Sequence, residues 1–437
     1  MSSVAAPAAP AVVPRSVLVA RNGVAVVFAL NGLAVATWFG RVPAAREALD
    51  LSAGRLGLLL LAMSAGAILA MPTAGLVGQR LGTARTSALA TLLLTLGLTM
   101  VGVSAGVVSS QAGVAVGLLA VGYGAGTCDV AMNIEGAAVE RRLGRTIMPR
   151  FHAAWSLGSV AGAGLGAGAA RVGLPVTLHL PLIAAVVVAG TLLGTRMFLP
   201  AGDTTPAGDT TSPATRRRAL LAAWREPRTL LIGLFVLVMA FAEGSANDWV
   251  AVAFVDGYDL SEAAGAAVFG VFVVGMTLGR TVGTVALDRW GRVWALAGTI
   301  LLAVLGAGVA VLAGSGPVAV AGVALWGLGA SLGFPVGMSA AADEEDRAPA
   351  RVSVVAVIGY TAFLGGPPLL GLLGDRVGTL HALLVVPILL LPTLALVPAT
   401  RPPTGGTPRQ PHGRTGSGPA GRKADIRSAA IRPSPDS

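Results

Sequence analysis

Residues 122–155 read GYGAGTCDVAMNIEGAAVERRLGRTIMPRFHAAW, and they take the chain from an apolar helix through a basic turn into the next apolar segment. Asp129 lies inside the apolar part, where an ionised carboxylate costs roughly several kcal/mol in hydrocarbon. The turn is rich in arginine, and basic residues gather in loops on the cytoplasmic side of a membrane. The stretch therefore predicts a functional carboxyl group inside a bilayer and the side on which the turn lies.

The composition of the chain is that of a membrane protein. Of its 437 residues, 54% are hydrophobic and 12% are charged, and the mean hydropathy is +0.76, whereas soluble domains carry about 25% charged residues. The net charge of +10 does not indicate nucleic-acid binding, because about half of the basic residues lie in short loops between apolar runs. Cys128 is the single cysteine, which excludes a disulfide framework and a cysteine-based zinc site.

Uncharged runs long enough to cross a bilayer, at about 20 residues each, predict an all-α membrane protein with twelve spans. Two longer runs each divide at a turn, one at Ser109-Ser110-Gln111 and the other at Gly314-Ser-Gly-Pro317. The expected spans are about 22–40, 56–79, two within 86–128, 152–170, 174–197, 229–252, 263–287, 293–313, 317–340, 353–373 and 379–398.

The spans fall into two halves of six. We expect a disordered lead (1–16), an N-terminal six-helix half (17–198), a solvated cytoplasmic linker (199–228), a C-terminal six-helix half (229–398) and a disordered basic tail (399–437). With the N-terminus inside, 25 Lys and Arg residues lie on cytoplasmic segments, five on outer loops and one, Arg280, within a span. The positive-inside rule therefore predicts a multi-pass protein of the cell inner membrane with both termini cytoplasmic.

An Arg-x-Gly element closes a span four times, as Arg80-Leu-Gly82, Arg171-Val-Gly173, Arg289-Trp-Gly291 and Arg376-Val-Gly378. These elements follow the second, fifth, eighth and eleventh spans, so the chain divides into four units of three helices. Successive units are inverted because three is odd, and inverted three-helix repeats are an architecture of secondary transporters.

Two of these loops carry a longer signature. Gly75-Leu-Val-Gly-Gln79-Arg80-Leu-Gly82 and Thr284-Val-Ala-Leu-Asp288-Arg289-Trp-Gly291-Arg292 resemble the loop signature of the major facilitator superfamily and its echo in the second half. The resemblance covers about residues 17–398. It implies a rocker-switch carrier with a central cavity between the halves. The signature residues are Gly75, Arg80, Gly82, Asp288, Arg289 and Gly291, and Gln79 replaces the usual aspartate of the first copy.

Three further motifs look similar to a bacterial inner-membrane subgroup of that superfamily, whose members mostly lack an assigned substrate. They are Asp129-x3-Asn133, Arg150-Phe-His152-x2-Trp155-Ser-x-Gly158 and Glu243-Gly-x3-Asp248-Trp249.

Two acid–amide pairs are the candidates for proton coupling and substrate binding. Asp129 and Asn133 share a helix face in the fourth span, and Glu243 and Asn247 do so in the seventh. The acid can take up a proton and the amide can hydrogen-bond a hydroxyl group, which suits a polar neutral solute. The alternative is that each carboxyl group is structural and hydrogen-bonded between helices.

Arg280 is the one basic residue within a span, and it is a gating candidate. At 1.5 Å per residue, Glu243 and Arg280 differ in depth by roughly 10 Å, whereas Asp129 and Arg280 are matched. We therefore expect an Asp129–Arg280 contact between the halves that helps to close the cytoplasmic side. The alternative is that Arg280 binds carbonyl groups within its own half.

Other polar residues leave two interpretations open. His152 is a proton relay or an interfacial packing residue, and Asp248 is an outer gate or an interfacial anchor. Asn31 is expected to line the cavity together with Trp38, Phe39 and Tyr360. We expect Glu135 in a charge cluster of the loop after the fourth span.

Close helix contact is expected along Gly158-x3-Gly162-x3-Gly166, since small residues let backbones approach. The resemblance also implies that the fifth and eighth spans meet across the interface between the halves.

The function expected is secondary active transport of a small polar solute, sugar- or nucleoside-like, coupled to protons. The alternatives are a proton-driven efflux antiporter, which usually has a Gly-Pro element absent here from the fifth span, and a non-transporting sensor or scaffold. No nucleotide-binding loop or nucleophile elbow is present, so we expect no enzyme, no metal and no cofactor. The expected partners are the solute, protons and the lipid bilayer, with the chain a monomer.

Overall fold

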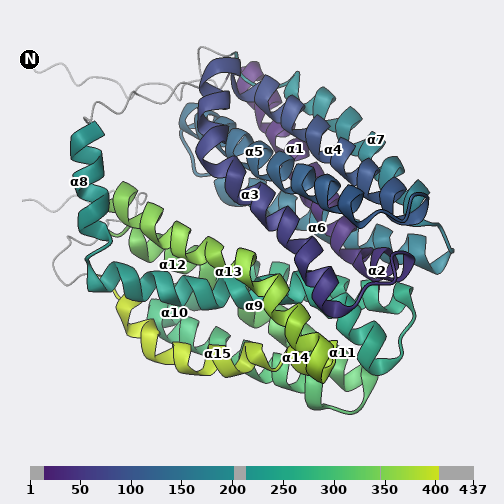
Figure 1. Ribbon diagram of the computed structural model, residues 1–437. Coiled ribbons are helices and arrows are strands. Elements are labelled where there is room, and N and C mark those ends of the chain that lie inside the picture. The colour runs from purple at the N-terminus through teal and green to yellow at the C-terminus, as the bar shows by residue number, and fades with distance from the viewer. Residues whose placement is uncertain (1–13, 201–212, 345, 403–437) are drawn as a thin grey trace, which may run out of the picture. The chain divides into compact units, whose positions relative to one another are not determined.

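The computed structural model describes residues 14–200, 213–344 and 346–402, and within them it consists of helices and turns without a strand (Figure 1). The expected lead, most of the tail and the middle of the linker lie outside the described residues.

The helices follow the predicted spans closely. The N-terminal half contains α1 (Arg15–Gly40), α2 (Val42–Ala48), α3 (Ala53–Leu81), α4 (Thr83–Gly106), α5 (Gln111–Leu143), α6 (Met148–Arg171) and α7 (Val176–Thr195). After α8 (Pro213–Ala223), the C-terminal half contains α9 (Pro227–Tyr258), α10 (Glu262–Leu312), α11 (Gly316–Ala330), α12 (Gly333–Ala341), α13 (Ala348–Val377), α14 (Thr379–Ala382), α15 (Val385–Thr393) and a 3-10 helix (Leu394–Thr400). Neither α2, in the first outer loop, nor α8, in the linker, was predicted as a helix.

Ten segments among the described residues are long and apolar enough to cross a membrane. One of them is the 51-residue α10, whose backbone is interrupted at Gly291, where two predicted spans join. The 24-residue α6 is not among the ten, because it is rich in glycine and alanine. An all-α membrane fold is confirmed, and the number twelve stays a prediction.

The four Arg-x-Gly elements share a backbone feature, since each glycine has a positive φ. Gly82, Gly291 and Gly378 have φ of 76°, 74° and 85° with ψ of 162°, 167° and 148°, a region that is essentially open to glycine alone. Gly173 has a φ of 67°. The repeat seen in the sequence is therefore also a repeat of helix-ending geometry.

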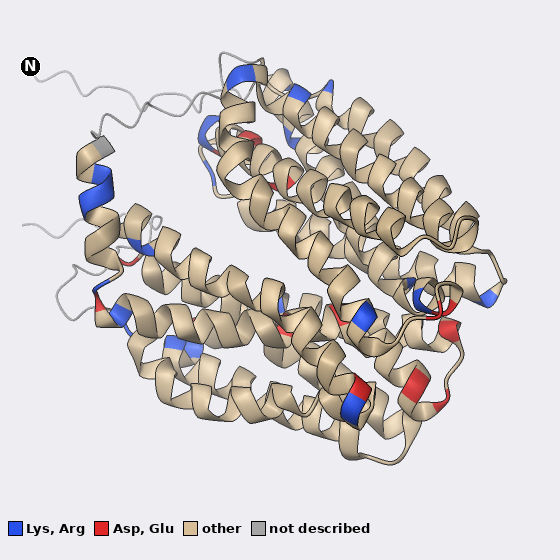
Figure 2. Cartoon of the chain, in the orientation of Figure 1, with Lys and Arg blue, Asp and Glu red and all other residues tan. Residues whose placement is uncertain are grey.

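Each half packs first within itself. In the N-terminal half α1 lies against α6, and α5 lies against α3 and α4; in the C-terminal half α9 lies against α13, and α10 against α11. The halves meet along two lines, α3 with α13 and α6 with α10, which we call the α3–α13 seam and the α6–α10 seam. Figure 2 shows that charged residues gather at the ends of the helices and are rare along their middles.

The glycine stripe of α6 has a different partner from the one across the interface. A β-carbon on Gly158 would lie 1.9 Å from the carbonyl oxygen of Ala29, and one on Gly162 would lie 2.3 Å from that of Leu33, both on α1. The stripe therefore joins α6 to its own half. The expected contact of α6 with α10 is made by another face, where Ala163 faces Gly270.

Candidate functional site

Asp129 and Asn133 lie on one face near the middle of α5, as predicted. The side-chain nitrogen of Asn133 donates to the backbone oxygen of Asp129 at 2.8 Å and to its Oδ1 at 3.2 Å. Asp129 is 14 residues before Leu143, roughly 21 Å along the helix, yet its side chain is exposed. An exposed carboxyl group at mid-helix faces the space between the halves, and within the described residues it has no cationic partner.

Glu243 on α9 pairs with Arg280 on α10, with 3.3 Å between Oε1 and the guanidinium nitrogen. The expected mismatch of these two residues was wrong. It compared backbone depths, whereas a long arginine side chain reaches along the helix axis. Arg280 is thus held within its own half, and an Asp129–Arg280 ion pair is not formed here. The side chains of Glu243 and Arg280 are 14% and 31% exposed, so both remain accessible from the space between the halves.

Two further side chains connect these groups. The hydroxyl of Tyr360 on α13 lies within electrostatic range of both Asp129 and Glu243, one carboxyl group from each half. His152 on α6 is exposed, packs edge-on against Phe28 at 5.3 Å, and lies within electrostatic range of Arg280. The structure therefore brings residues of both halves around a common polar space.

The remaining candidates on α9 are placed less decisively. Asn247 lies one turn beyond Glu243 on the same face, and both it and Asp248 are partly buried. Within the described residues, neither side chain makes a hydrogen bond or an ion pair.

Other expected site residues are buried in helix contacts instead. Asn31 is 6% exposed and its amide donates to the carbonyl of Ala125 at 3.3 Å, and Trp38 is 1% exposed. Glu135 does not belong to an exposed loop cluster. It is fully buried and accepts hydrogen bonds from the Thr83 hydroxyl at 2.6 Å and the Leu199 backbone at 2.7 Å. Spacing alone cannot tell a cavity-facing residue from one that faces a neighbouring helix.

Three polar contacts join the halves, and we call them the gate. Among the described residues they are the only hydrogen bonds or ion pairs between the halves. The gate consists of Arg41–Glu262 at 3.1 Å, Arg46–Asp256 at 2.5 Å and Ser52–Asp375 at 3.3 Å. All three lie where α1, α9 and α13 finish and α3 and α10 begin, which we call the gate end. The halves are therefore closed to each other at this end.

Arg41 is the most buried member of the gate. It is 2% exposed and donates to the carbonyl oxygen of Leu174, 2.8 Å away, while it reaches Glu262 of the other half. Burial lowers the pKa of Arg41, and the Glu262 carboxylate opposes this shift. A guanidinium stays charged in proteins, so the ion pair persists over the physiological pH range. The sequence placed Arg41 and Arg46 only as loop charges, because nothing in their spacing names a partner 200 residues away.

The opposite end, where the signature loops lie, has no such contacts. Arg80, Asp288 and Arg289 are exposed, and no ion pair involves them within the part of the chain that is described. A β-carbon on Gly75 would meet nothing within 4 Å. The polar space around Asp129 and Glu243 is closed at the gate end and open toward the signature loops. No cluster of His, Cys, Asp or Glu in the described residues is arranged to hold a metal ion.

A family model described as Major Facilitator Superfamily matches residues 24–343 and 244–433. The chain belongs to the Major Facilitator Superfamily. An uncharacterised MFS-type transporter of Yersinia pestis is 31% identical over 371 residues, covering 84% of this chain and 92% of the relative. An uncharacterised transporter of Sinorhizobium fredii is 31% identical over 362 residues, covering 83% and 93%. The family and subgroup expected from the loop motifs are thereby confirmed.

Solved structures agree with this assignment of the fold. A mutant of the nucleoside transporter NupG superposes with a TM-score of 0.73 at 13% identity, covering 87% of this chain and 99% of that one. A variant of the E. coli fucose:proton symporter FucP gives 0.59 at 16% identity, covering 89% and 100%. This MFS protein is thus a multi-pass membrane protein with the fold of secondary transporters.

Proposed function

We propose that this MFS protein carries a small polar solute, sugar- or nucleoside-like, by alternating access, and that the movement is coupled to protons. The observation that carries the proposal is the polar space at mid-membrane depth, where Asp129 from one half and Glu243 from the other approach Tyr360. The similar structures that are named for nucleoside and fucose transport support this substrate class.

The two carboxyl groups suggest different parts in coupling. Asp129 lacks a cationic partner among the described residues, and an uncompensated carboxylate at this depth is unfavourable by roughly several kcal/mol. Proton uptake removes that cost. Glu243 is already paired with Arg280, so its protonation would release the guanidinium. The hydrogen-bonding amides of Asn133 and Asn247 lie one turn from these carboxyl groups and suit the hydroxyl groups of a neutral solute.

The direction of opening follows from the distribution of basic residues. The positive-inside rule places the signature loops and both termini in the cytoplasm. On that orientation the gate lies on the outer side, and the structure is an inward-open state of a carrier that we propose to act as a monomer.

The test uses purified protein in liposomes with an internal pH dye and a panel of nucleosides and hexoses. We compare wild type with Asp129→Asn and Glu243→Gln. The matched control is Asp259→Asn, since Asp259 is an exposed loop residue with a φ of 51° that asparagine adopts equally well. We expect solute-dependent proton flux in the wild type and the control, and its loss in at least one carboxyl variant.

Each other outcome contradicts a defined part of the proposal. Solute uptake without proton movement would remove the coupling but keep the carrier. Unchanged flux in both carboxyl variants would remove their roles. Absence of flux across the panel would contradict the substrate class and favour the sensor interpretation.

A further inference from the structure

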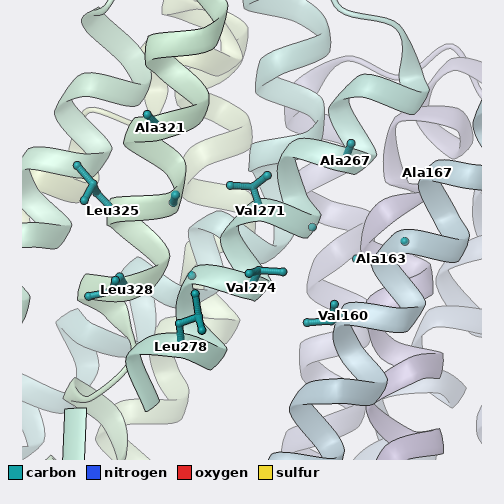
Figure 3. A pocket seen from close by; sticks show the side chains of 14 residues that line it. Val160, Ala163, Ala167, Ala267, Val271, Val274, Leu278, Ala321, Leu325 and Leu328 are labelled. Carbon is teal, nitrogen blue, oxygen red and sulfur yellow. The ribbon is translucent and has the colours of Figure 1, made fainter. Parts of the chain in front are cut away.

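The α6–α10 seam contains an apolar crevice of about 650 Å³ (Figure 3). Its 14 lining residues are all glycine, alanine, valine or leucine, so it offers no polar group to a water-soluble ligand. Figure 3 shows Val160 and Ala167 of α6 on one side, Val271 and Leu278 of α10 in the middle, and Leu325 of α11 on the other side. The crevice therefore spans both halves of the protein.

The crevice lies in one leaflet of the membrane. On α6 it occupies residues 160–167, which are 4 to 11 residues before Arg171 at the gate end. On α11 it occupies residues 321–328, which are 5 to 12 residues after the helix begins at Gly316. At 1.5 Å per residue both positions are roughly 6–18 Å from that end, which is the depth of the hydrocarbon of one leaflet in a core about 30 Å thick.

A cationic group stands above the crevice. Val160, Gly164, Ala167 and Arg171 follow each other at helical spacing and form one stripe along α6. Arg171 is exposed and makes no hydrogen bond or ion pair among the described residues. Arginine binds phosphate well because its guanidinium presents several donors in a plane. The hydrophobic crevice and the cation at headgroup level together match the two ends of a phospholipid.

We propose that a phospholipid of the gate-end leaflet binds here, with one acyl chain in the crevice and its phosphate at Arg171. The site is independent of the transported solute and of the polar space between the halves. Because α6 and α10 belong to different halves, rocking of the halves reshapes the crevice. The bound acyl chain therefore favours the state seen in this structure over one in which α6 and α10 approach each other.

The experiment maps where lipid acyl chains touch the protein. Purified protein is reconstituted in phosphatidylcholine vesicles containing a phosphatidylcholine with a photoreactive diazirine at mid-chain. After illumination, adducts are located by peptide mass spectrometry. We expect adducts at residues 160–167, 271–278 and 321–328 to exceed those on the lipid-facing side of α4, where Leu89 and Leu96 are exposed.

Two variants with matched controls separate the parts of the site. Gly164→Leu fills the crevice without a clash, since its β-carbon meets nothing within 4 Å, and we expect a fall in crevice adducts of at least about tenfold. Gly298→Leu, equally open and membrane-facing but outside the crevice, leaves the yield unchanged. Arg171→Gln lowers the yield by about fivefold, the effect of one basic residue at a lipid surface. Arg376→Gln, in the same motif at the same end, leaves it unchanged.

Three results would overturn the lipid site. The first is a crevice yield no higher than that on α4 in the wild-type protein, a measurement that needs no variant. The second is an equal fall in Gly164→Leu and Gly298→Leu. The third is displacement of the crevice adducts by a nucleoside or hexose, which would assign the crevice to cargo instead.

Discussion

The two seams between the halves are built differently. Along the α3–α13 seam the backbones touch: a β-carbon on Gly57 would lie 2.4 Å from the carbonyl oxygen of Pro367, and one on Gly371 would lie 2.5 Å from that of Ala53. Along the α6–α10 seam a β-carbon on Gly270 would find its nearest neighbour at 3.7 Å, and one on Gly164 would find none within 4 Å.

The difference indicates how the halves are held and where they can move. The tight seam continues into the gate through Ser52 and Asp375, so backbone packing and polar contacts act together there. The loose seam is filled by side chains of low volume and leaves the crevice. We infer that the tight seam fixes the closed end, while the loose seam tolerates rearrangement.

Removing the buried cation of the gate should have the largest effect. Arg41→Ala leaves Glu262 without its partner at the gate end, and loss of one member of a buried ion pair is destabilising by about 3–5 kcal/mol. We expect a lower melting temperature of the detergent-solubilised protein. Arg55→Ala is the control, since Arg55 is an exposed arginine of the same end without an ion pair in the described residues. Equal melting temperatures in the two variants would contradict the assigned role of Arg41.

Enlarging a glycine should separate the two seams. Gly57→Leu forces α3 and α13 apart, and overpacking of this kind typically destabilises by about 1–3 kcal/mol. Gly164→Leu at the loose seam should change stability by no more than about 0.5 kcal/mol. The comparison is made by thermal unfolding and by thiol labelling of Ser52→Cys, whose reactivity should rise only beside Gly57→Leu. Cys128 is buried and is the single native cysteine, so the background is low. If both glycine variants behaved alike, the distinction between the seams would be lost.

Neutralising a more exposed gate residue should have the smallest effect. Asp256→Asn removes the charge that faces Arg46, and the two side chains are 33% and 22% exposed. Pairs of this exposure contribute about 0.2–1 kcal/mol. The loss of stability should shrink at high salt, because ions screen exposed charges. Unfolding measured at low and high salt checks this, and a loss that does not depend on salt would show that Asp256 acts mainly through its hydrogen bond from Thr379.

Much of the fold could be read from the chain in advance. The predicted spans match the helices because hydrocarbon demands long uncharged runs, and the Arg-x-Gly elements match the positive-φ glycines because no other residue adopts that backbone easily. Asp129 and Asn133 form the expected pair because their spacing is local to one helix.

Contacts between helices were predicted less well. Arg280 meets Glu243 rather than Asp129, and the glycine stripe of α6 meets α1 rather than α10. Both errors concern which partner a helix face meets. That choice depends on helix tilt, rotation and side-chain reach, none of which is encoded in residue spacing.

The sequence by itself determined that this protein crosses a membrane, that it repeats a three-helix unit, and that it keeps carboxyl groups at mid-membrane depth. Each of these follows from local physical rules for apolar length, glycine conformation and helical spacing. Only the tertiary structure decided which carboxyl group holds Arg280, which end is closed by the gate, and which seam stays open as a crevice. These depend on the packing of helices far apart in the chain, where side-chain volumes and backbone approach choose among partners that the sequence leaves equivalent.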